Sequence, residues 1–127
     1  MIQNTVRLLL LDEQKRMLFV QKTETQAWHW PGGKQKSNEK PVRALKREVF
    51  EETGVRIIKI QLVHTEYLPE ETIRCYTANC KNMQCKKPDG KEISKICWRS
   101  LARAMQLPLT ETQKKLQQNI AIIAQFL

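Results

Sequence analysis

The sequence predicts an α/β sandwich, in which a mixed β-sheet is flanked by helices. Segments with strand patterns and segments with helix patterns alternate along the chain in the order strand, helix, strand, helix. The 127 residues are enough for one hydrophobic core but not for two. No internal repeat, low-complexity segment or linker divides the sequence, so we expect a single domain over residues 1–127.

The first elements are two short apolar segments separated by a polar turn. Thr5–Leu11 has the character of a buried strand, and Met17–Lys22 is typical of a second one. Residues 12–15 are Asp-Glu-Gln-Lys and favour a turn, so we expect the two strands to form a hairpin. Thr23–Trp30 then serves as a connecting loop. Its tryptophans could stack on a base, but packing at the base of the loop is the simpler interpretation. His29 could contact a phosphate, but a surface or capping role is the simpler interpretation.

The central element is an amphipathic helix. Pro41 suits the first helical turn, and Gly54 stands where a helix ends with a positive φ. Val42, Leu45 and Val49 recur at i, i+3 and i+7, which predicts an apolar stripe facing the core.

A second hairpin follows this helix. Residues 55–63, VRIIKIQLV, indicate a strand that continues less regularly to Tyr67. Residues 68–71 form a turn that contains Pro69, and Thr72–Cys80 alternates apolar and polar side chains as a returning strand does.

The last third of the chain predicts one more strand and a final helix. Lys86–Lys91 is a loop, and Glu92–Trp98 follows as a late strand. Ser100–Gln106 favours a short helical turn. Thr110 caps a last helix that runs through Leu127 and presents one apolar stripe, formed by Leu116, Ile120, Ile123 and Phe126 or Leu127.

Three carboxylates of the central helix point to a metal site. Glu48, Glu51 and Glu52 are spaced by three and four residues and therefore lie on one side of the helix. Carboxylates crowded together repel, and a hard divalent cation such as Mg²⁺ removes that repulsion. A solvated acidic face is the alternative. The glycine pair Gly32-Gly33 precedes the helix and lets the backbone approach a phosphate closely.

The composition is strongly basic. The formal charge of +9 is spread over both halves, with ten basic and seven acidic side chains in residues 1–55 and twelve and six in residues 56–127. Such a surface attracts polyanions such as nucleotides or RNA, although a role in solubility explains the charge equally well.

Neither a signal peptide nor a membrane span is evident, since the longest early apolar run is Leu8–Leu11, so we expect a cytoplasmic protein without membrane contact. Its oligomeric state is left open. The cysteines form no C-x-x-C pair, so we expect reduced, mostly buried thiols; they are Cys75, Cys80, Cys85 and Cys97.

The stretch from Gly33 to Val55 resembles the Nudix box. That box reads Gly, five residues, Glu, seven residues, then Arg-Glu-aliphatic-any-Glu-Glu-any-Gly-aliphatic. All nine fixed positions are matched here, by Gly33, Glu39, Arg47, Glu48, Val49, Glu51, Glu52, Gly54 and Val55. The preceding Trp-x-Trp-Pro-Gly also resembles the family's lead-in. As a departure, Asn38 stands where many members have glycine, and Lys40 is a poor residue for the helix cap.

The resemblance implies roles for these residues. Glu48, Glu51 and Glu52 would bind one or more Mg²⁺ ions, with Mn²⁺ as a substitute, and Glu48 would also act as base or orient the attacking water. Arg47 would fix Glu48 through a charge-assisted hydrogen bond. Further roles belong to the loop and the late strand: Gly32, Gly33 and Lys34 near phosphate oxygens, Glu39 in support of the loop or of another metal, and Glu92 as a metal-binding or catalytic glutamate or a solvated loop residue.

By resemblance the chain is a compact MutT-like Nudix hydrolase that cleaves a phosphoanhydride bond. The expected substrate is a nucleoside diphosphate linked to another group, above all a (deoxy)nucleoside triphosphate cleaved to monophosphate and pyrophosphate. An RNA 5′-triphosphate pyrophosphohydrolase and a non-catalytic module that binds nucleotides or nucleic acid are the alternatives. Members that recognise oxidised guanine carry an asparagine near the start of the last helix. The corresponding stretch Pro108–Thr110 has none, so the sequence does not predict that specificity.

Overall fold

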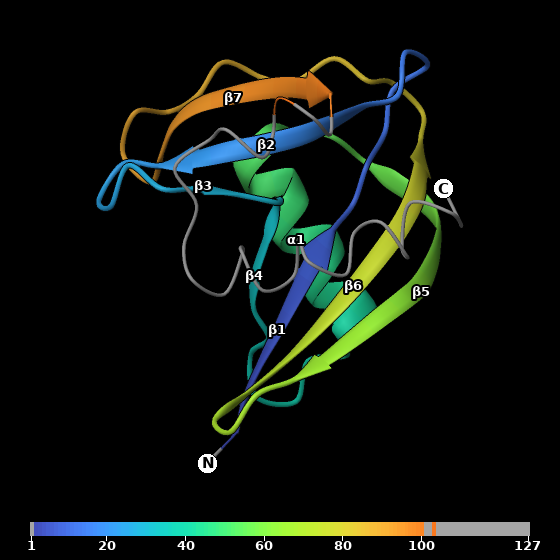
Figure 1. The fold of residues 1–127 in the computed structure, drawn as a ribbon, viewed down its shortest axis with the longest axis vertical. Coiled ribbons are helices and arrows are strands. Elements are labelled where there is room, and N and C mark those ends of the chain that lie inside the picture. The colour runs from blue at the N-terminus through green and yellow to red at the C-terminus, as the bar shows by residue number, and fades with distance from the viewer. Residues whose placement is uncertain (1, 101–102, 104–127) are drawn as a thin grey trace.

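The computed structural model describes residues 2–100 and Arg103. In this part of the chain, one long helix packs with two β-sheets (Figure 1). The four-stranded sheet has the order β4-β1-β6-β5, with bounds Gly32–Lys34, Gln3–Leu8, Glu71–Cys80 and Ile57–Tyr67. The three-stranded sheet has the order β3-β2-β7, with bounds Trp28–His29, Arg16–Lys22 and Ile93–Ser100. The larger sheet is mixed, as predicted, because β1 runs parallel to β6 and antiparallel to β4.

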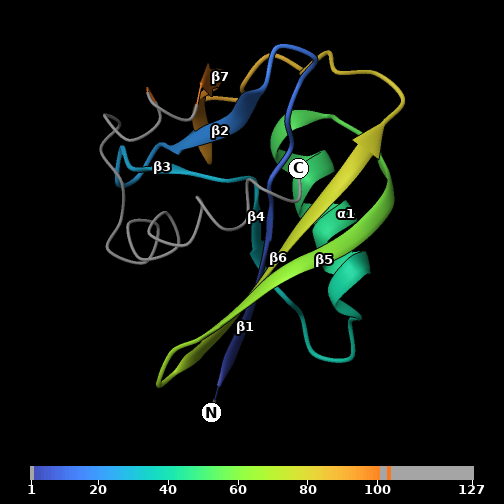
Figure 2. The same cartoon turned by 45° about the vertical axis from the view of Figure 1, so that its right-hand side comes forward.

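Helix α1, Pro41–Thr53, lies against the larger sheet and reaches the smaller one (Figure 2). A single buried cluster joins α1 to both sheets, through Val6 and Leu8 of β1, Leu18 of β2 and Ala44, Leu45 and Val49 of α1. Burial of these apolar side chains is what fixes the helix in place.

A second buried cluster lies between β2, β3, β6 and the segment that follows β1. Trp30 is fully buried and stacks on Phe19, with 6.2 Å between the ring centroids. Trp28 is 8% exposed and belongs to the same cluster. The packing interpretation of both tryptophans is therefore confirmed.

The ends of α1 follow the predicted signals. Lys40 is the N-cap and makes no side-chain cap hydrogen bond, whereas Gly54 has φ 76° and donates its N–H to the carbonyl of Phe50. Asn38 has φ 64°, a left-handed conformation that asparagine tolerates better than most residues. The predicted apolar stripe is wrong at one position, because Val42 is 40% exposed and the buried face is formed instead by Ala44, Leu45, Val49, Glu52 and Thr53.

The predicted hairpin of the first two strands is also wrong. Strands β1 and β2 belong to different sheets. The turn between them is closed by an isolated bridge from Leu11 to Met17 and by the backbone hydrogen bonds that flank it, such as that from the N–H of Leu18 to the carbonyl of Leu10. The physical reason is that Leu9 and Leu10 are both buried, in the two different clusters, as the chain passes from one sheet to the other. The loop expected over Thr23–Trp30 contains the short strand β3, which pairs with β2.

The later strands agree with the prediction. Strands β5 and β6 form the expected antiparallel hairpin, with two register irregularities, and β7 covers the predicted late strand. The four cysteines are free thiols, with Cys75 buried and the others partly buried. Among the described residues, no helix has the length and apolar character to cross a membrane. The final helix expected from Thr110 lies outside the described residues, as does most of the turn expected at Ser100–Gln106.

Candidate active site

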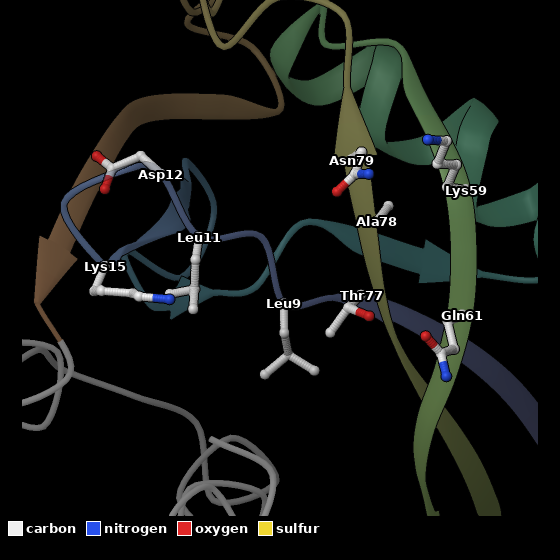
Figure 3. A pocket seen from close by; sticks show the side chains of 9 residues that line it. All are labelled: Leu9, Leu11, Asp12, Lys15, Lys59, Gln61, Thr77, Ala78 and Asn79. Carbon is white, nitrogen blue, oxygen red and sulfur yellow. The ribbon is translucent and has the colours of Figure 1, made fainter. Parts of the chain in front are cut away.

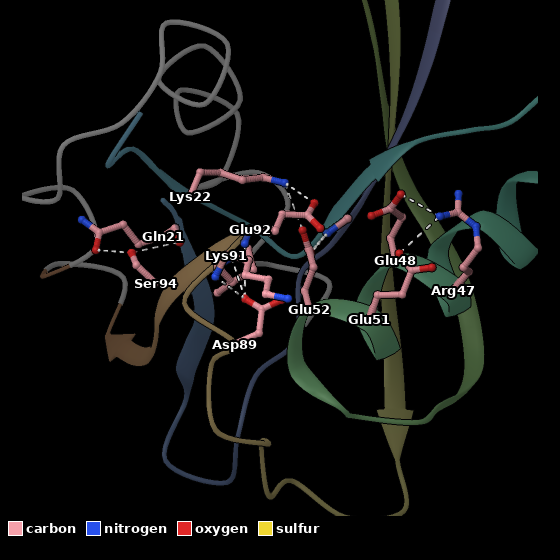
Figure 4. Close-up of polar contacts among 12 residues, drawn as sticks. Gln21, Lys22, Arg47, Glu48, Glu51, Glu52, Asp89, Lys91, Glu92 and Ser94 are labelled. Carbon is pink, nitrogen blue, oxygen red and sulfur yellow. Dashed lines mark hydrogen bonds and ion pairs between the residues drawn. The ribbon is translucent and has the colours of Figure 1, made fainter. Parts of the chain in front are cut away.

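Three carboxylates meet at the junction of α1 and the smaller sheet. Glu48 and Glu52 lie one turn apart on α1, and Glu92 directly precedes β7. One ligand oxygen from each lies within 4.8 Å of the other two. Figure 4 shows Glu92 and Glu52 side by side, with Glu48 farther along the helix. Glu92 is thus brought next to two of the three helical carboxylates, although it lies 40 or more positions from them in the sequence.

Glu51 lies apart from this cluster. Its side chain is 50% exposed and pairs with Arg47, at 3.5 Å from Nη1 to Oε2. The spacing that places Glu51 on the same side of the helix as Glu48 and Glu52 therefore does not bring it into their group. Its role as a ligand stays a prediction.

Arg47 fastens the helix to the preceding loop. Its Nη1 donates to Oε1 of Glu48 at 2.9 Å, the contact that the sequence predicts. Its Nε and Nη2 donate to both carboxylate oxygens of Glu39, at 2.9 and 3.0 Å. The hydrogen bond from Arg47 lowers the pKa of Glu39 to about 2. Glu39 also accepts the N–H of Lys36, so it supports the loop.

Glu52 is the buried member of the cluster. Its side chain is 1% exposed, and desolvation raises the pKa of its carboxyl to about 7. The N–H of Gly32 donates to its Oε1 at 2.9 Å and favours the charged form, as does the ammonium of Lys22 at 3.3 Å from Oε2. The Gly32 N–H, which the sequence places near phosphate oxygens, is thus engaged by a glutamate.

The two glycines of β4 serve different neighbours. A Cβ on Gly33 would lie 2.6 Å from the carboxylate carbon of Glu48, so this glycine leaves room for the glutamate. Gly32 has φ 144°, and a Cβ there would lie 2.0 Å from the carbonyl oxygen of Val6. The sequence motif shows that glycines are needed, and the structure adds which groups they accommodate.

Two adjoining pockets open beside the carboxylates. One of about 360 Å³ is lined by Gln3, Thr5, Arg7, Lys22, Gly33, Lys34, Glu48 and Glu92. The other, of about 460 Å³, is lined by Lys22, Glu24, Thr25, His29, Lys34, Lys91 and Glu92. Because the two share Lys22, Lys34 and Glu92, cations stand next to the cluster in both. That combination suits a polyphosphate bound through cations on one side and carboxylates on the other.

The sequence interpretation missed two of these cations. Arg7 lies on the same side of β1 as Gln3 and Thr5, and its Nη1 donates to the carbonyl of Trp30 at 3.0 Å. Lys22 ends β2 and reaches Glu52 and Glu92. The only sequence signal for Arg7 is an arginine inside an otherwise apolar strand. His29 lies nearby, and burial together with Arg7 and Lys22 lowers its pKa to about 4, so it is neutral near pH 7.

A further cavity lies elsewhere on the molecule (Figure 3). It has about 460 Å³ and is lined by Leu9, Leu11, Asp12, Lys15, Lys59, Gln61, Thr77, Ala78 and Asn79. Its single carboxylate, Asp12, is paired with Arg16 at 2.7 Å. This cavity therefore offers no counterpart to the carboxylate cluster.

The cluster has the chemistry of a site for a hard divalent cation. It offers carboxylate oxygens only, and Glu52 is a buried carboxylate whose charged form needs a nearby cation. Mg²⁺ is commonly held by a few carboxylates together with substrate phosphates. The donor set fits such an ion.

Comparison with known proteins places the chain in a family. The family model for the NUDIX domain matches residues 1–120. The chain is 36% identical over 104 residues to an 8-oxo-dGTP diphosphatase of Buchnera aphidicola subsp. Acyrthosiphon pisum, covering 79% of this chain and 83% of that protein. It is 31% identical over 58 residues to an RNA pyrophosphohydrolase of Francisella philomiragia, covering 46% of this chain and 37% of that protein.

A solved structure supports the same fold. A MutT structure from a study of Aliivibrio salmonicida and Vibrio cholerae superposes with a TM-score of 0.81 at 17% identity, covering 98% of this chain and 99% of that one. The mixed sheet and α1 agree with this likeness. The chain therefore belongs to the Nudix family, as a MutT-like pyrophosphohydrolase with the family's α/β/α sandwich fold.

Proposed function

We propose that the chain hydrolyses a (deoxy)nucleoside triphosphate to the monophosphate and pyrophosphate in a Mg²⁺-dependent reaction. The observation that carries this proposal is the pocket in which Glu48 and Glu92 stand beside Arg7, Lys22 and Lys34. The relative named an 8-oxo-dGTP diphosphatase adds support for a triphosphate substrate.

Glu48, Glu52 and Glu92 would hold the divalent ion, Mg²⁺ or Mn²⁺ as a substitute. When bound, such an ion supplies neutralisation of phosphate charge and a lowered pKa of water. Glu51, the remaining predicted ligand, is separated from this group in the structure. Comparison of Glu51→Gln with Glu92→Gln therefore distinguishes the two assignments, and we expect the larger loss of ion affinity in Glu92→Gln.

The remaining residues orient Glu48 and neutralise the charge of the phosphates. Arg47 holds Glu48 in one orientation, because its guanidinium is itself fixed by two hydrogen bonds to Glu39. Glu48 is then available to take a proton from water or to orient it. Arg7 and Lys34 line the pocket as cations for the phosphates.

A substrate panel tests the proposal. Product formation would be measured with Mg²⁺ and with a chelator, as pyrophosphate released from each nucleoside triphosphate and from 8-oxo-dGTP, and as the nucleotides released from ADP-ribose and from a dinucleoside polyphosphate. We expect pyrophosphate from at least one triphosphate with Mg²⁺ and none with the chelator. Turnover of no polyphosphate, together with tight nucleotide binding without metal, would support the non-catalytic alternative. The panel includes 8-oxo-dGTP because Pro108–Thr110 lies outside the described residues.

RNA with a 5′-triphosphate is a second candidate substrate. The net charge of +9 favours a polyanion, and one relative is named an RNA pyrophosphohydrolase. A triphosphorylated RNA oligonucleotide would be added to the panel beside the free triphosphate of its first nucleotide. A higher kcat/KM for the oligonucleotide would favour RNA.

A further inference from the structure

We propose that Lys22 is a built-in, exchangeable cation of the carboxylate site. Its ammonium neutralises Glu52 and Glu92 in the metal-free protein, leaves them when a divalent ion binds, and then contacts the phosphates of the substrate. This inference rests on the proposed function in one respect, namely that the carboxylates take a divalent ion.

The geometry places the ammonium between two carboxylates. Nζ of Lys22 lies 3.3 Å from Oε2 of Glu52 and 3.3 Å from Oε1 of Glu92 (Figure 4). Both glutamates belong to the group whose ligand oxygens lie within 4.8 Å of one another. An ammonium and a divalent ion repel strongly at such distances. Lys22 and the ion therefore compete for the same two carboxylates.

The backbone keeps Lys22 and Glu92 together. The N–H of Lys22 donates to the carbonyl of Ala27, and the N–H of Thr23 donates to the carbonyl of Glu92 at 3.0 Å. The pairing of β2 with β7 shifts register between Gln21 and Lys22. The two residues thus stay adjacent in the metal-free and metal-bound protein alike, and only the lysine side chain needs to move.

The third carboxylate has a different kind of partner. Glu48 is paired with Arg47, whose planar guanidinium also makes two hydrogen bonds to Glu39. That network fixes the arginine. Lys22 is instead a single point charge on a flexible stem, and its side chain is 25% exposed. The site therefore combines a fixed cation at Glu48 with a movable one at Glu52 and Glu92.

The released ammonium can stay in the wall of the adjoining pockets. Lys22 lines both pockets beside the cluster, so a small rotation of its side chain keeps it at the wall where phosphates would bind. Binding of the ion and binding of phosphate are then coupled, because the ion releases the Lys22 ammonium, which can then contact the phosphate. By linkage, phosphate must strengthen ion binding by the same factor.

The exchange predicts opposite effects of one substitution. Lys22→Met removes the competing charge, so the ion should bind more tightly. The same change leaves the buried Glu52 without its ammonium, so the metal-free protein should unfold at a lower temperature. A residue with a purely structural role would lower stability without improving ion affinity.

The test measures Mn²⁺ binding and thermal unfolding in wild type, Lys22→Met and Lys95→Met. Lys95 is an exposed lysine on β7 that lines neither adjoining pocket, so it controls for the loss of one positive charge. We expect the Mn²⁺ dissociation constant of Lys22→Met to be about fivefold or more below that of wild type. The constant of Lys95→Met should stay within about twofold of wild type. Metal-free Lys22→Met should melt about 5 °C lower, and saturating Mn²⁺ should remove that difference.

A second measurement follows the coupling. Mn²⁺ should raise the affinity of wild type for inorganic pyrophosphate more than that of Lys22→Met. Lys22→Gln replaces Lys22→Met if the latter does not fold. Unchanged or weaker Mn²⁺ affinity in both Lys22 variants would overturn the exchange. If the wild-type protein still hydrolysed a triphosphate, the proposed function would stand. Absence of Mn²⁺ binding and of turnover in wild type would overturn the exchange and the proposed function together.

Discussion

At the scale of single residues, the acidic side chains of α1 differ by their surroundings. Glu52 is buried and its pKa is raised to about 7, because desolvation outweighs its hydrogen bond from Gly32. Glu48 is 13% exposed and paired with Arg47, and Glu51 is half exposed. Three glutamates of one motif thus meet three environments, and substitution of each should have a different effect.

We expect Glu52→Gln to abolish most activity at little cost in stability. The amide keeps an acceptor for the Gly32 N–H and removes a desolvated charge, so the free energy of unfolding should stay within about 1 kcal/mol of wild type. Turnover should fall about 10²-fold or more, the effect expected when a group that stabilises the transition state is lost. Steady-state kinetics and thermal unfolding of the metal-free protein measure the two effects. Wild-type turnover in this variant would contradict the assignment of Glu52.

The glycines of β4 predict a matched pair of outcomes. In Gly33→Ala the new methyl meets the flexible end of Glu48, so we expect a folded protein whose turnover falls about tenfold or more through displacement of that carboxylate. In Gly32→Ala the methyl meets the backbone of Val6, and we expect a loss of more than about 2 kcal/mol of stability. Circular dichroism and kinetics on both variants check this. Equal losses of stability would show that Gly33 is not placed for Glu48.

At the scale of elements, α1 carries the site on a helix with a weak first turn. Pro41 suits its start, but Lys40 gives no side-chain cap and the first turn contains no acidic residue. Its C-terminal end is well closed by Gly54. The stability of α1 therefore comes from its buried face and from Arg47, which ties it to Glu39.

We expect Lys40→Asp to stabilise the protein by about 1 kcal/mol, since aspartate can accept an N–H of the first turn and suits the positive end of the helix dipole. Lys46→Asp is the control, because it makes the same charge change at an exposed position inside α1. Chemical unfolding of both variants measures the difference. An equal shift in the two would assign the effect to net charge, and turnover of Lys40→Asp should match wild type.

Structural features that depend on neighbouring residues could be predicted from the sequence. Features that depend on contacts between residues far apart in the sequence could not. The ends of α1, the β5–β6 hairpin and the left-handed Asn38 each follow from a local preference. The separation of β1 and β2 into different sheets depends on where Leu9 and Leu10 are buried. Likewise, the approach of Lys22 to Glu92 joins residues 70 positions apart, which no local pattern reports.

At the scale of the whole molecule, the site depends on how the two sheets meet. The larger sheet and α1 supply Gly33, Glu48 and Glu52, whereas the smaller sheet supplies Lys22 and the start of β7 brings Glu92. The shared buried cluster holds these parts in register. Assembly of the carboxylate cluster is thus a consequence of folding as a whole, within a chain of net charge +9.

That charge predicts a salt dependence that separates encounter from chemistry. A positively charged protein attracts a triphosphate electrostatically, and salt screens this attraction. The Debye length falls from about 10 Å at 0.1 M to about 3 Å at 1 M ionic strength. We expect kcat/KM for a nucleoside triphosphate to fall several-fold between about 0.05 and 0.5 M NaCl, whereas kcat should change less than about twofold.

The same experiment distinguishes the two candidate substrates. If RNA phosphates beyond the 5′-triphosphate contact the basic surface, the logarithm of kcat/KM should fall more steeply with the logarithm of salt concentration for a triphosphorylated oligonucleotide than for the free nucleotide. Each additional phosphate neutralised on a single strand steepens the slope by about 0.7. Equal slopes would mean that only the triphosphate is bound, and the positive charge would then serve solubility rather than recognition of RNA.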